Sequence, residues 1–267
     1  MKYTVQPLLN GFFTVAFKGN EIMKFPKVNN IPSFIFLITS EEGEHIIVDT
    51  GFDLSHIPGP DSSGIKKSEH EIPAIFNRLG IDPLSIKKLI QTHLHWDHAA
   101  GIKHFPNAEI YVQAAEFNGL FSLREFEETS FAPHHWLDSL DRFILLNGDC
   151  EIMPGIKLLQ SGGHTEGHQG VRVNGMEKSI VLIGDSPFTY EWLWTLVPVS
   201  FWDNYRVGAG RKFFWQDELS VQLRDWYEKH KPAESLVRTY RTVNELKSSG
   251  DIALFSHDPG LDGTELY

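Results

Sequence analysis

Three histidines and an aspartate lie within six consecutive residues, in the stretch His93-Leu94-His95-Trp96-Asp97-His98. The apolar run of residues 86–90 precedes it and predicts a buried strand that ends in a loop. In extended backbone, side chains two residues apart project the same way about 6.6 Å apart, so His93 and His95 can share one metal ion held at roughly 2.0–2.1 Å. Asp97 and His98 come where a short helix (residues 98–104) is predicted, and they point to a second, adjacent position. The stretch predicts a strand end that carries a site for two metal ions.

A histidine-rich loop can also be a polar surface or contain an isolated buried histidine. Here, four ligand-type side chains at positions i, i+2, i+4 and i+5 would cluster without a partner unless a cation lay between them. Metal binding is therefore the prediction. Zn²⁺ is the expected ion, with Mn²⁺, Fe²⁺ and Co²⁺ as alternatives, because histidine and carboxylate ligands suit all four.

Composition limits the partners and the compartment. A net charge of −11 over 267 residues argues against nucleic acid, although two divalent cations would make the site itself positive. The single cysteine, Cys150, excludes an internal disulfide and is predicted to pack as a small apolar side chain. No signal peptide and no apolar stretch of membrane-spanning length is visible, so the expected location is the cytoplasm, without a membrane partner.

The sequence around His93 resembles the HxHxDH signature of the metallo-β-lactamase superfamily. Further motifs of that superfamily follow in the same order along the chain: Val48-Asp49-Thr50-Gly51, Gly162-Gly163-His164-Thr165-Glu166-Gly167-His168, Ile183-Gly184-Asp185 and Phe255-Ser256-His257-Asp258. Within the superfamily, the chain looks most like the N-acyl-homoserine lactonase and pyridoxolactonase branch.

The resemblance implies an α/β fold, the metallo-β-lactamase-type αββα four-layer sandwich with the metal site at one edge of the two sheets. It predicts one domain over residues 1–267, with cap insertions around residues 115–141 and 188–216. The aromatic residues of these segments either cover the substrate or belong to the core, and their number would also fit a homodimer contact. Residues 52–69 are predicted to form a mobile entrance loop, and His134 and His135 fit no ligand spacing.

The resemblance also implies a division of the ligands between two metal ions. The first ion would be held by His93, His95 and His164, the second by Asp97, His98 and His257, and Asp185 would bridge both. Asp49 is either a turn-forming residue or, as the resemblance favours, a carboxylate that orients ligands. His168 is expected to support its loop rather than to bind metal.

The implied activity is hydrolysis of a small-molecule ester by a metal-bridging hydroxide, with Asp97 passing a proton to the leaving oxygen. A lactone is the expected substrate. In the homoserine lactonases, a tyrosine three positions after the bridging aspartate binds the substrate carbonyl. In this chain that position is Phe188. Tyr190 is a candidate to replace the tyrosine, but the spacing does not decide whether its side chain reaches the substrate. Two alternatives stay open: a glyoxalase-II-like thioesterase, and a ligand- or partner-binding protein with structural metals.

Overall fold

The computed structural model describes residues 1–15, 28–59, 62–123, 128–162, 164–185, 252–258, 261 and 266–267. Its strands are β1 (Tyr3–Val15), β2 (Val28–Ser40), β3 (His45–Val48), β4 (Ser63–Ile65), β5 (Lys88–Ile90), β6 (Glu109–Gln113), β7 (Phe143–Leu146), β8 (Cys150–Met153), β9 (Ile156–Gln160), β10 (Gln169–Asn174), β11 (Ser179–Leu182) and β12 (Ile252–Leu254). Its α-helices are α1 (Ile72–Leu79), α2 (Trp96–Ala99) and α3 (Ala114–Gly119), and 3-10 helices span Ser68–His70, Pro83–Ser85, Ile102–His104, Pro133–His135 and Leu137–Arg142. None of the described helices is long and apolar enough to cross a membrane.

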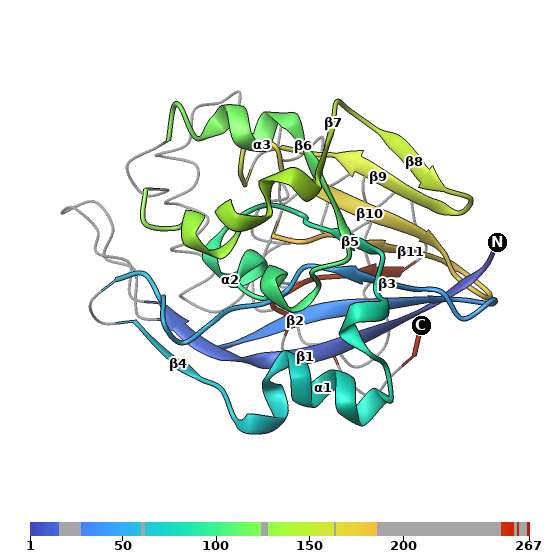
Figure 1. Cartoon of the computed structure of the whole chain (residues 1–267), viewed down its shortest axis with the longest axis horizontal. Helices are drawn as coiled ribbons and strands as arrows, with labels where there is room; N and C mark the ends of the chain where they lie inside the picture. The colour runs from blue at the N-terminus through green and yellow to red at the C-terminus, as the bar shows by residue number, and fades with distance from the viewer. Residues whose placement is uncertain are drawn as a thin grey trace, which may run out of the picture.

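The first sheet has seven strands in the order β4-β1-β2-β3-β5-β6-β7 (Figure 1). Strands β1 and β2 form a long antiparallel pair, whereas β3, β5, β6 and β7 run parallel to one another. The carboxyl ends of parallel strands meet at one edge of a sheet, and the loops there are where α/β proteins place their sites. The loops after β3, β5 and β6 therefore lie side by side.

The second sheet has five strands in the order β12-β11-β10-β9-β8. Strand β12 pairs in parallel with β11, although about 70 residues separate them along the chain, and the other pairs are antiparallel. The loops after β11 and β12 consequently leave the sheet at the same edge. These two loops carry Asp185 and His257.

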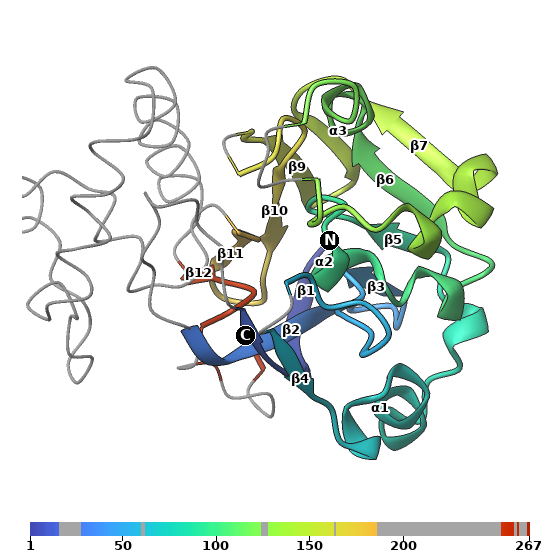
Figure 2. The same cartoon turned by 90° about the vertical axis from the view of Figure 1, so that its left-hand side faces the viewer.

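Two apolar layers hold the sheets and helices together. Alternate residues of β1, β2 and β3 face the second sheet, and Phe36 and Val48 belong to the same buried cluster as Val171 and Leu182 of that sheet. The opposite face of the first sheet packs against Ile72, Ile75 and Phe76 of α1 and against α3. Figure 2 shows α1 on the side of the first sheet that faces away from β9, β10 and β11. The expected layered α/β sandwich is confirmed.

Several predicted boundaries are wrong. Strand β1 begins at Tyr3 and β2 at Val28, and the two pair over most of their length. The expected entrance loop of residues 52–69 contains β4, which pairs with β1. The helix expected over residues 98–104 is instead α2, which ends at Ala99, followed by the 3-10 helix Ile102–His104. Gly101 between them packs closely on the loop after β3, since an added Cβ would lie 2.5 Å from the Thr50 carbonyl oxygen.

Some predictions fall on residues outside the described ranges. They are the cap insertion of residues 188–216 and part of the insertion around residues 115–141. Cys150 lies within the described part, where its half-buried thiol is free and packs against the core between the sheets.

Candidate metal centre

All seven residues predicted to be ligands come together at one edge of the sandwich. Their ligand atoms form two groups, and within each group these atoms lie within 4.8 Å of one another. The first group consists of His93, His95 and His164, and the second consists of Asp97, His98, Asp185 and His257. They reach this edge from five places in the chain: the loop after β5, helix α2, the β9–β10 connection, and the loops after β11 and β12.

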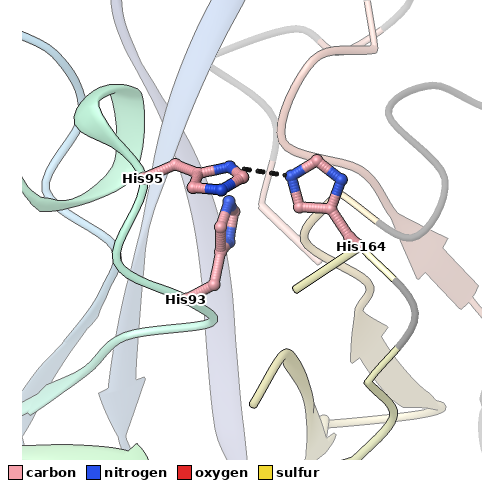
Figure 3. Close-up of side chains that lie close together, drawn as sticks. All are labelled: His93, His95 and His164. Carbon is pink, nitrogen blue, oxygen red and sulfur yellow. Dashed lines mark hydrogen bonds between the residues drawn. The ribbon is translucent and has the colours of Figure 1, made fainter. Parts of the chain in front are cut away.

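The first group contains only imidazoles. His93 and His95 project from the loop after β5, and His164 faces them from the second sheet (Figure 3). The His164 Nε2 atom lies 3.0 Å from His95 Nδ1, and the ring centroids of His93 and His95 are 4.6 Å apart. Three imidazoles from two sheets thus surround one position.

The second group combines two imidazoles with two carboxylates. The Nε2 atoms of His98 and His257 each lie 3.2 Å from Asp185 Oδ1 and 3.3 Å from each other. The Asp97 carboxylate closes the group, because its Oδ2 is 3.4 Å from His257 Nε2. All four side chains are buried.

Asp185 lies between the two groups and turns one oxygen to each. Its Oδ1 faces the second group, whereas its Oδ2 lies 3.6 Å from His164 Nε2 and 3.9 Å from His93 Nε2. A carboxylate in this position can contribute one oxygen to each of two neighbouring cations.

Hydrogen bonds at the other ring nitrogens fix which nitrogen each imidazole presents. His98 Nδ1 donates to Asp49 Oδ2 at 2.8 Å, and His257 Nδ1 donates to the Pro32 carbonyl oxygen at 2.8 Å. Thr92 Oγ1 donates to Asp49 Oδ2, so it accepts from His93 Nδ1 at 3.0 Å. All three rings consequently turn Nε2 inward, as partners of this kind arrange for metal-binding histidines.

Asp49 organises this support from a strained backbone position. Its φ is +59°, a left-handed conformation that non-glycine residues adopt rarely. The buried carboxylate accepts hydrogen bonds from the Thr92 backbone N–H at 2.7 Å and from the Thr92 hydroxyl and the His98 ring at 2.8 Å each. Asp49 therefore links the loop after β3 to the ligand loop after β5.

His168 packs beside His93 and His164 but belongs to neither group, because both of its ring nitrogens are hydrogen-bonded to other residues. Its Nε2 accepts a hydrogen bond from the Asp185 N–H at 3.1 Å, and its Nδ1 therefore donates to Ser161 Oγ. Burial lowers the pKa of His168 to about 3, so the ring is neutral at physiological pH. This side chain fixes the backbone from which the Asp185 carboxylate projects.

The electrostatics of the two groups differ. Burial lowers the pKa of His93 and of His164 well below the ordinary value, and neighbouring imidazoles lower it further. Burial also opposes charge on His98 and His257, yet the Asp185 carboxylate raises the pKa of His98 well above the ordinary value and helps to raise that of His257 to about 9. The second group therefore favours a positive charge within it.

The donor set fits divalent metal ions. His93 Nε2 is buried, points into the first group and makes no hydrogen bond within the described part of the chain. The second group places two carboxylates beside imidazole nitrogens, a donor set that Zn²⁺ and similar ions accept. Buried nitrogens and carboxylates facing one another are what a bound cation would satisfy.

Sequence reasoning missed one buried carboxylate beside the centre, that of Glu116 in α3. It accepts hydrogen bonds from the Leu94 backbone and from two residues that follow His164. The available signal was a charged residue between Ala115 and Phe117 in a short helix that follows a buried strand. Phe188 and Tyr190, predicted to contact substrate, lie outside the described residues.

The fold and its metal-ligand clusters define the class of protein as a metal-dependent hydrolase of the metallo-β-lactamase kind. Residues 28–228 match the family model of the metallo-beta-lactamase superfamily, and the chain belongs to that superfamily.

Known lactonases are similar to this chain. It is 30% identical over 191 residues to N-acyl homoserine lactonase of Bacillus thuringiensis, covering 66% of this chain and 72% of that protein. N-acyl homoserine lactonase AttM of Azorhizobium caulinodans is 30% identical over 178 residues, with 60% of this chain and 67% of that protein covered. A solved structure of an N-acyl homoserine lactone hydrolase, with N-hexanoyl-L-homoserine bound at its catalytic metal center, superposes with a TM-score of 0.65 at 26% identity, covering 97% of this chain and 95% of that one. The lactonase branch is thus the part of the superfamily that the chain resembles.

Proposed function

We propose that this protein is a dinuclear metal-dependent hydrolase that opens lactones, and that residues 1–267 act as one domain. The observation that carries the proposal is the position of Asp185, whose two oxygens face two separate groups of ligand atoms. Two adjacent cations would be held by His93, His95 and His164 on one side and by Asp97, His98 and His257 on the other. Zn²⁺ is the ion we expect.

Two such ions would lower the pKa of a water molecule, which could then act as a nucleophile, and they would polarise the substrate carbonyl. The protein's part is to hold the ligands in position and to move a proton. Asp97 suits the second task, because it is the more exposed of the two carboxylates in the ligand groups. Its side chain is 8% exposed, against 1% for Asp185. We propose that Asp97 accepts the proton that the attacking water gives up and delivers it to the ring oxygen, which leaves as an alkoxide when its bond to the carbonyl carbon breaks.

The choice of a lactone rests on the similarity to the homoserine lactonases. Acyl-homoserine lactones are the first substrates to test. Other cyclic esters belong in the same test, because position 188, where the resemblance implies a tyrosine that binds the substrate carbonyl, is occupied by Phe188. Tyr190 is the proposed substitute. A small neutral substrate also agrees with the net charge of −11, which disfavours polyanions.

The direct experiment is to measure hydrolysis of a panel of lactones by the purified protein. The panel contains acyl-homoserine lactones of increasing chain length and simple γ- and δ-lactones, each assayed as purified, after chelation, and after Zn²⁺ or Mn²⁺ is restored. We expect turnover that disappears on chelation and returns with metal. His164→Ala should abolish it, whereas His134→Ala, a matched change of a histidine outside both groups, should not.

Three outcomes would contradict the proposal, each in a different way. Failure to hydrolyse any lactone in the presence of metal would remove the lactonase assignment. Turnover of S-lactoylglutathione alone would select the thioesterase alternative. Tight metal binding without turnover of esters or thioesters would favour a binding protein with structural metals.

The predicted homodimer and cytoplasmic location belong to the same proposal. Light scattering coupled to size-exclusion chromatography measures the first, with a mass near twice that of the chain expected. Fractionation of the source cells tests the second.

A further inference from the structure

The Glu116 carboxylate receives three hydrogen-bond donors from two loops that are distant in sequence. Its Oε1 accepts from the backbone N–H of Leu94 at 2.9 Å, and Leu94 lies between the first-group residues His93 and His95. Its Oε2 accepts from the Thr165 hydroxyl at 2.6 Å and from the Gly167 N–H at 3.1 Å. Both of these residues follow His164, the first-group residue contributed by the other sheet.

A carboxylate satisfies these three donors in a way that a neutral amide of the same size does not. Ionised glutamate has only acceptor atoms, whereas glutamine has one acceptor and one NH₂ donor group. In a Glu116→Gln variant the NH₂ group would face either the Leu94 N–H or the pair formed by Thr165 and Gly167. The site is buried, so a donor left without an acceptor there is costly.

Close packing leaves the loop after His164 little freedom to find other partners. A Cβ added at Gly167 would lie 2.1 Å from the Glu116 backbone nitrogen and 2.5 Å from its Cα, so the chain after His164 passes directly over the start of α3. Gly119, at the other end of α3, also lies close to the same loop, where an added Cβ would be 3.1 Å from Glu166 Cβ. Glu116 is thus enclosed between the loops that it joins.

The second group does not share these contacts. Its histidines are oriented by Asp49 and by the Pro32 carbonyl oxygen, whereas the three Glu116 hydrogen bonds described above go to Leu94, Thr165 and Gly167. A change at Glu116 should therefore act on one group and spare the other.

We propose that Glu116 is a positioning residue that locks the His93–His95 loop to the His164 loop and thereby sets the geometry of the first metal position. The inference rests on the proposed function only in taking the first group to be a metal site. In this role Glu116 contacts neither metal nor substrate, and its effect on catalysis passes through the three histidines.

Metal titration of the whole purified protein tests the proposal. The affinities for Zn²⁺ are measured by competition with a chromophoric chelator, and Co²⁺ absorption spectra report the geometry of each position. His164→Gln and His257→Gln identify which equivalent of metal belongs to which group. Glu109→Gln, an exposed glutamate in the strand that precedes α3, is the matched control.

We expect Glu116→Gln to lower the affinity for one Zn²⁺ ion, the ion whose binding His164→Gln abolishes. The affinity should fall by about 10- to 100-fold, the usual effect of losing a partner that orients a ligand. The Co²⁺ spectrum of that position should change while the other stays as in the wild type. Glu116→Asp, which keeps the acceptors but shortens the side chain, should recover part of the affinity. Thr165→Val removes one donor only and should cause a smaller loss at the same position.

Equal weakening of both positions, or unchanged affinity at both, in Glu116→Gln would overturn the inference. If that variant does not fold, Thr165→Val decides by the same criterion. A wild-type protein that binds no metal would instead refute the proposed function, so the two failures are distinguishable.

Discussion

The described part of the molecule contains two clusters of histidines, and they differ in their carboxylates, their hydrogen-bond partners and their pKa values. One is the buried metal centre. The other, here called the rim cluster, consists of His56, His134 and His135. The segment that leads to the rim cluster is joined to the centre, because the Trp96 N–H donates to the Ser130 carbonyl oxygen and the Phe131 ring packs on His95.

Crowding of imidazoles does not distinguish the two clusters. Ring centroids in the rim cluster are 4.1 to 6.0 Å apart, a spacing similar to that within the first ligand group. The rim cluster has no carboxylate to match Asp185, and among the described residues only the two groups of the centre gather their ligand atoms closely enough for one ion. In the centre, Asp49 and Thr92 also fix which nitrogen the rings present.

This comparison indicates that crowded histidines alone do not make a candidate metal site. The site also needs nearby carboxylates, and hydrogen-bond partners for the ring nitrogens that face away from the metal position. The pKa values follow the same division. Burial, reinforced by His134 and His56, lowers the pKa of His135 to about 4, whereas in the centre burial of His257 is more than offset by Asp185 and Asp97 together, which raise its pKa to about 9. A positive charge is therefore disfavoured on His135 of the rim cluster and favoured on His257 in the second group of the centre.

The largest effect should come from removing the shared carboxylate, which would make the centre resemble the rim cluster. We expect Asp185→Asn to lower the metal affinity by more than about 100-fold, because the loss of a residue that only orients a ligand already lowers it by about 10- to 100-fold. Hydrolysis should fall below detection. Chelator competition and the lactone assay measure the two quantities, and retention of both equivalents at wild-type affinity would contradict the assignment of Asp185.

A smaller effect is expected from Asp49→Asn. Asparagine tolerates the left-handed backbone of this position, so the variant isolates the loss of acceptors for Thr92 and His98 from backbone strain. Metal affinity should fall by about 10- to 100-fold without loss of the fold. Titration checks the affinity, and circular dichroism checks the fold. Wild-type affinity in this variant would show that the histidines need no such support.

The rim cluster predicts a pH dependence of stability. The folded-state pKa of His135 is about 4, below its ordinary value of 6.5, so the unfolded chain binds more protons between these values and stability falls as the pH drops through this window. His135→Gln should therefore lose less stability than the wild type between pH 7 and pH 4.5. Urea unfolding of chelator-treated protein at the two pH values measures this difference. An identical loss in the wild type and His135→Gln would refute it.

The smallest expected effect is that of the rim cluster on metal binding. A variant with all three rim histidines changed to glutamine should bind the same number of Zn²⁺ ions as the wild type and hydrolyse substrate within about twofold. Elemental analysis after gel filtration gives the number of ions. Loss of an equivalent would mean that the rim cluster does bind metal and that the contrast with the centre is wrong.

Much of the centre could be predicted from the sequence because its signals are local. His93, His95, Asp97 and His98 lie within six residues after an apolar strand, and each of the more distant motifs also follows or precedes a recognisable strand. The strands were harder to delimit. Long pairing extends β1 and β2 well beyond their apolar centres, and β4, β8 and β10 give weak patterns by themselves, since strand formation depends on the neighbours that a strand meets.

The sequence by itself determined the superfamily, the strand ends that carry ligand-type side chains, and the identity of those side chains. The tertiary structure alone decided that Asp185 turns one oxygen to each group, that Asp49 and Thr92 set the ring nitrogens, and that Glu116 joins two loops some 70 residues apart. The physical reason is that a ligand's chemical type belongs to a residue. The hydrogen bonds that orient it come from segments brought together only when parallel strands align their ends at one edge of the sandwich.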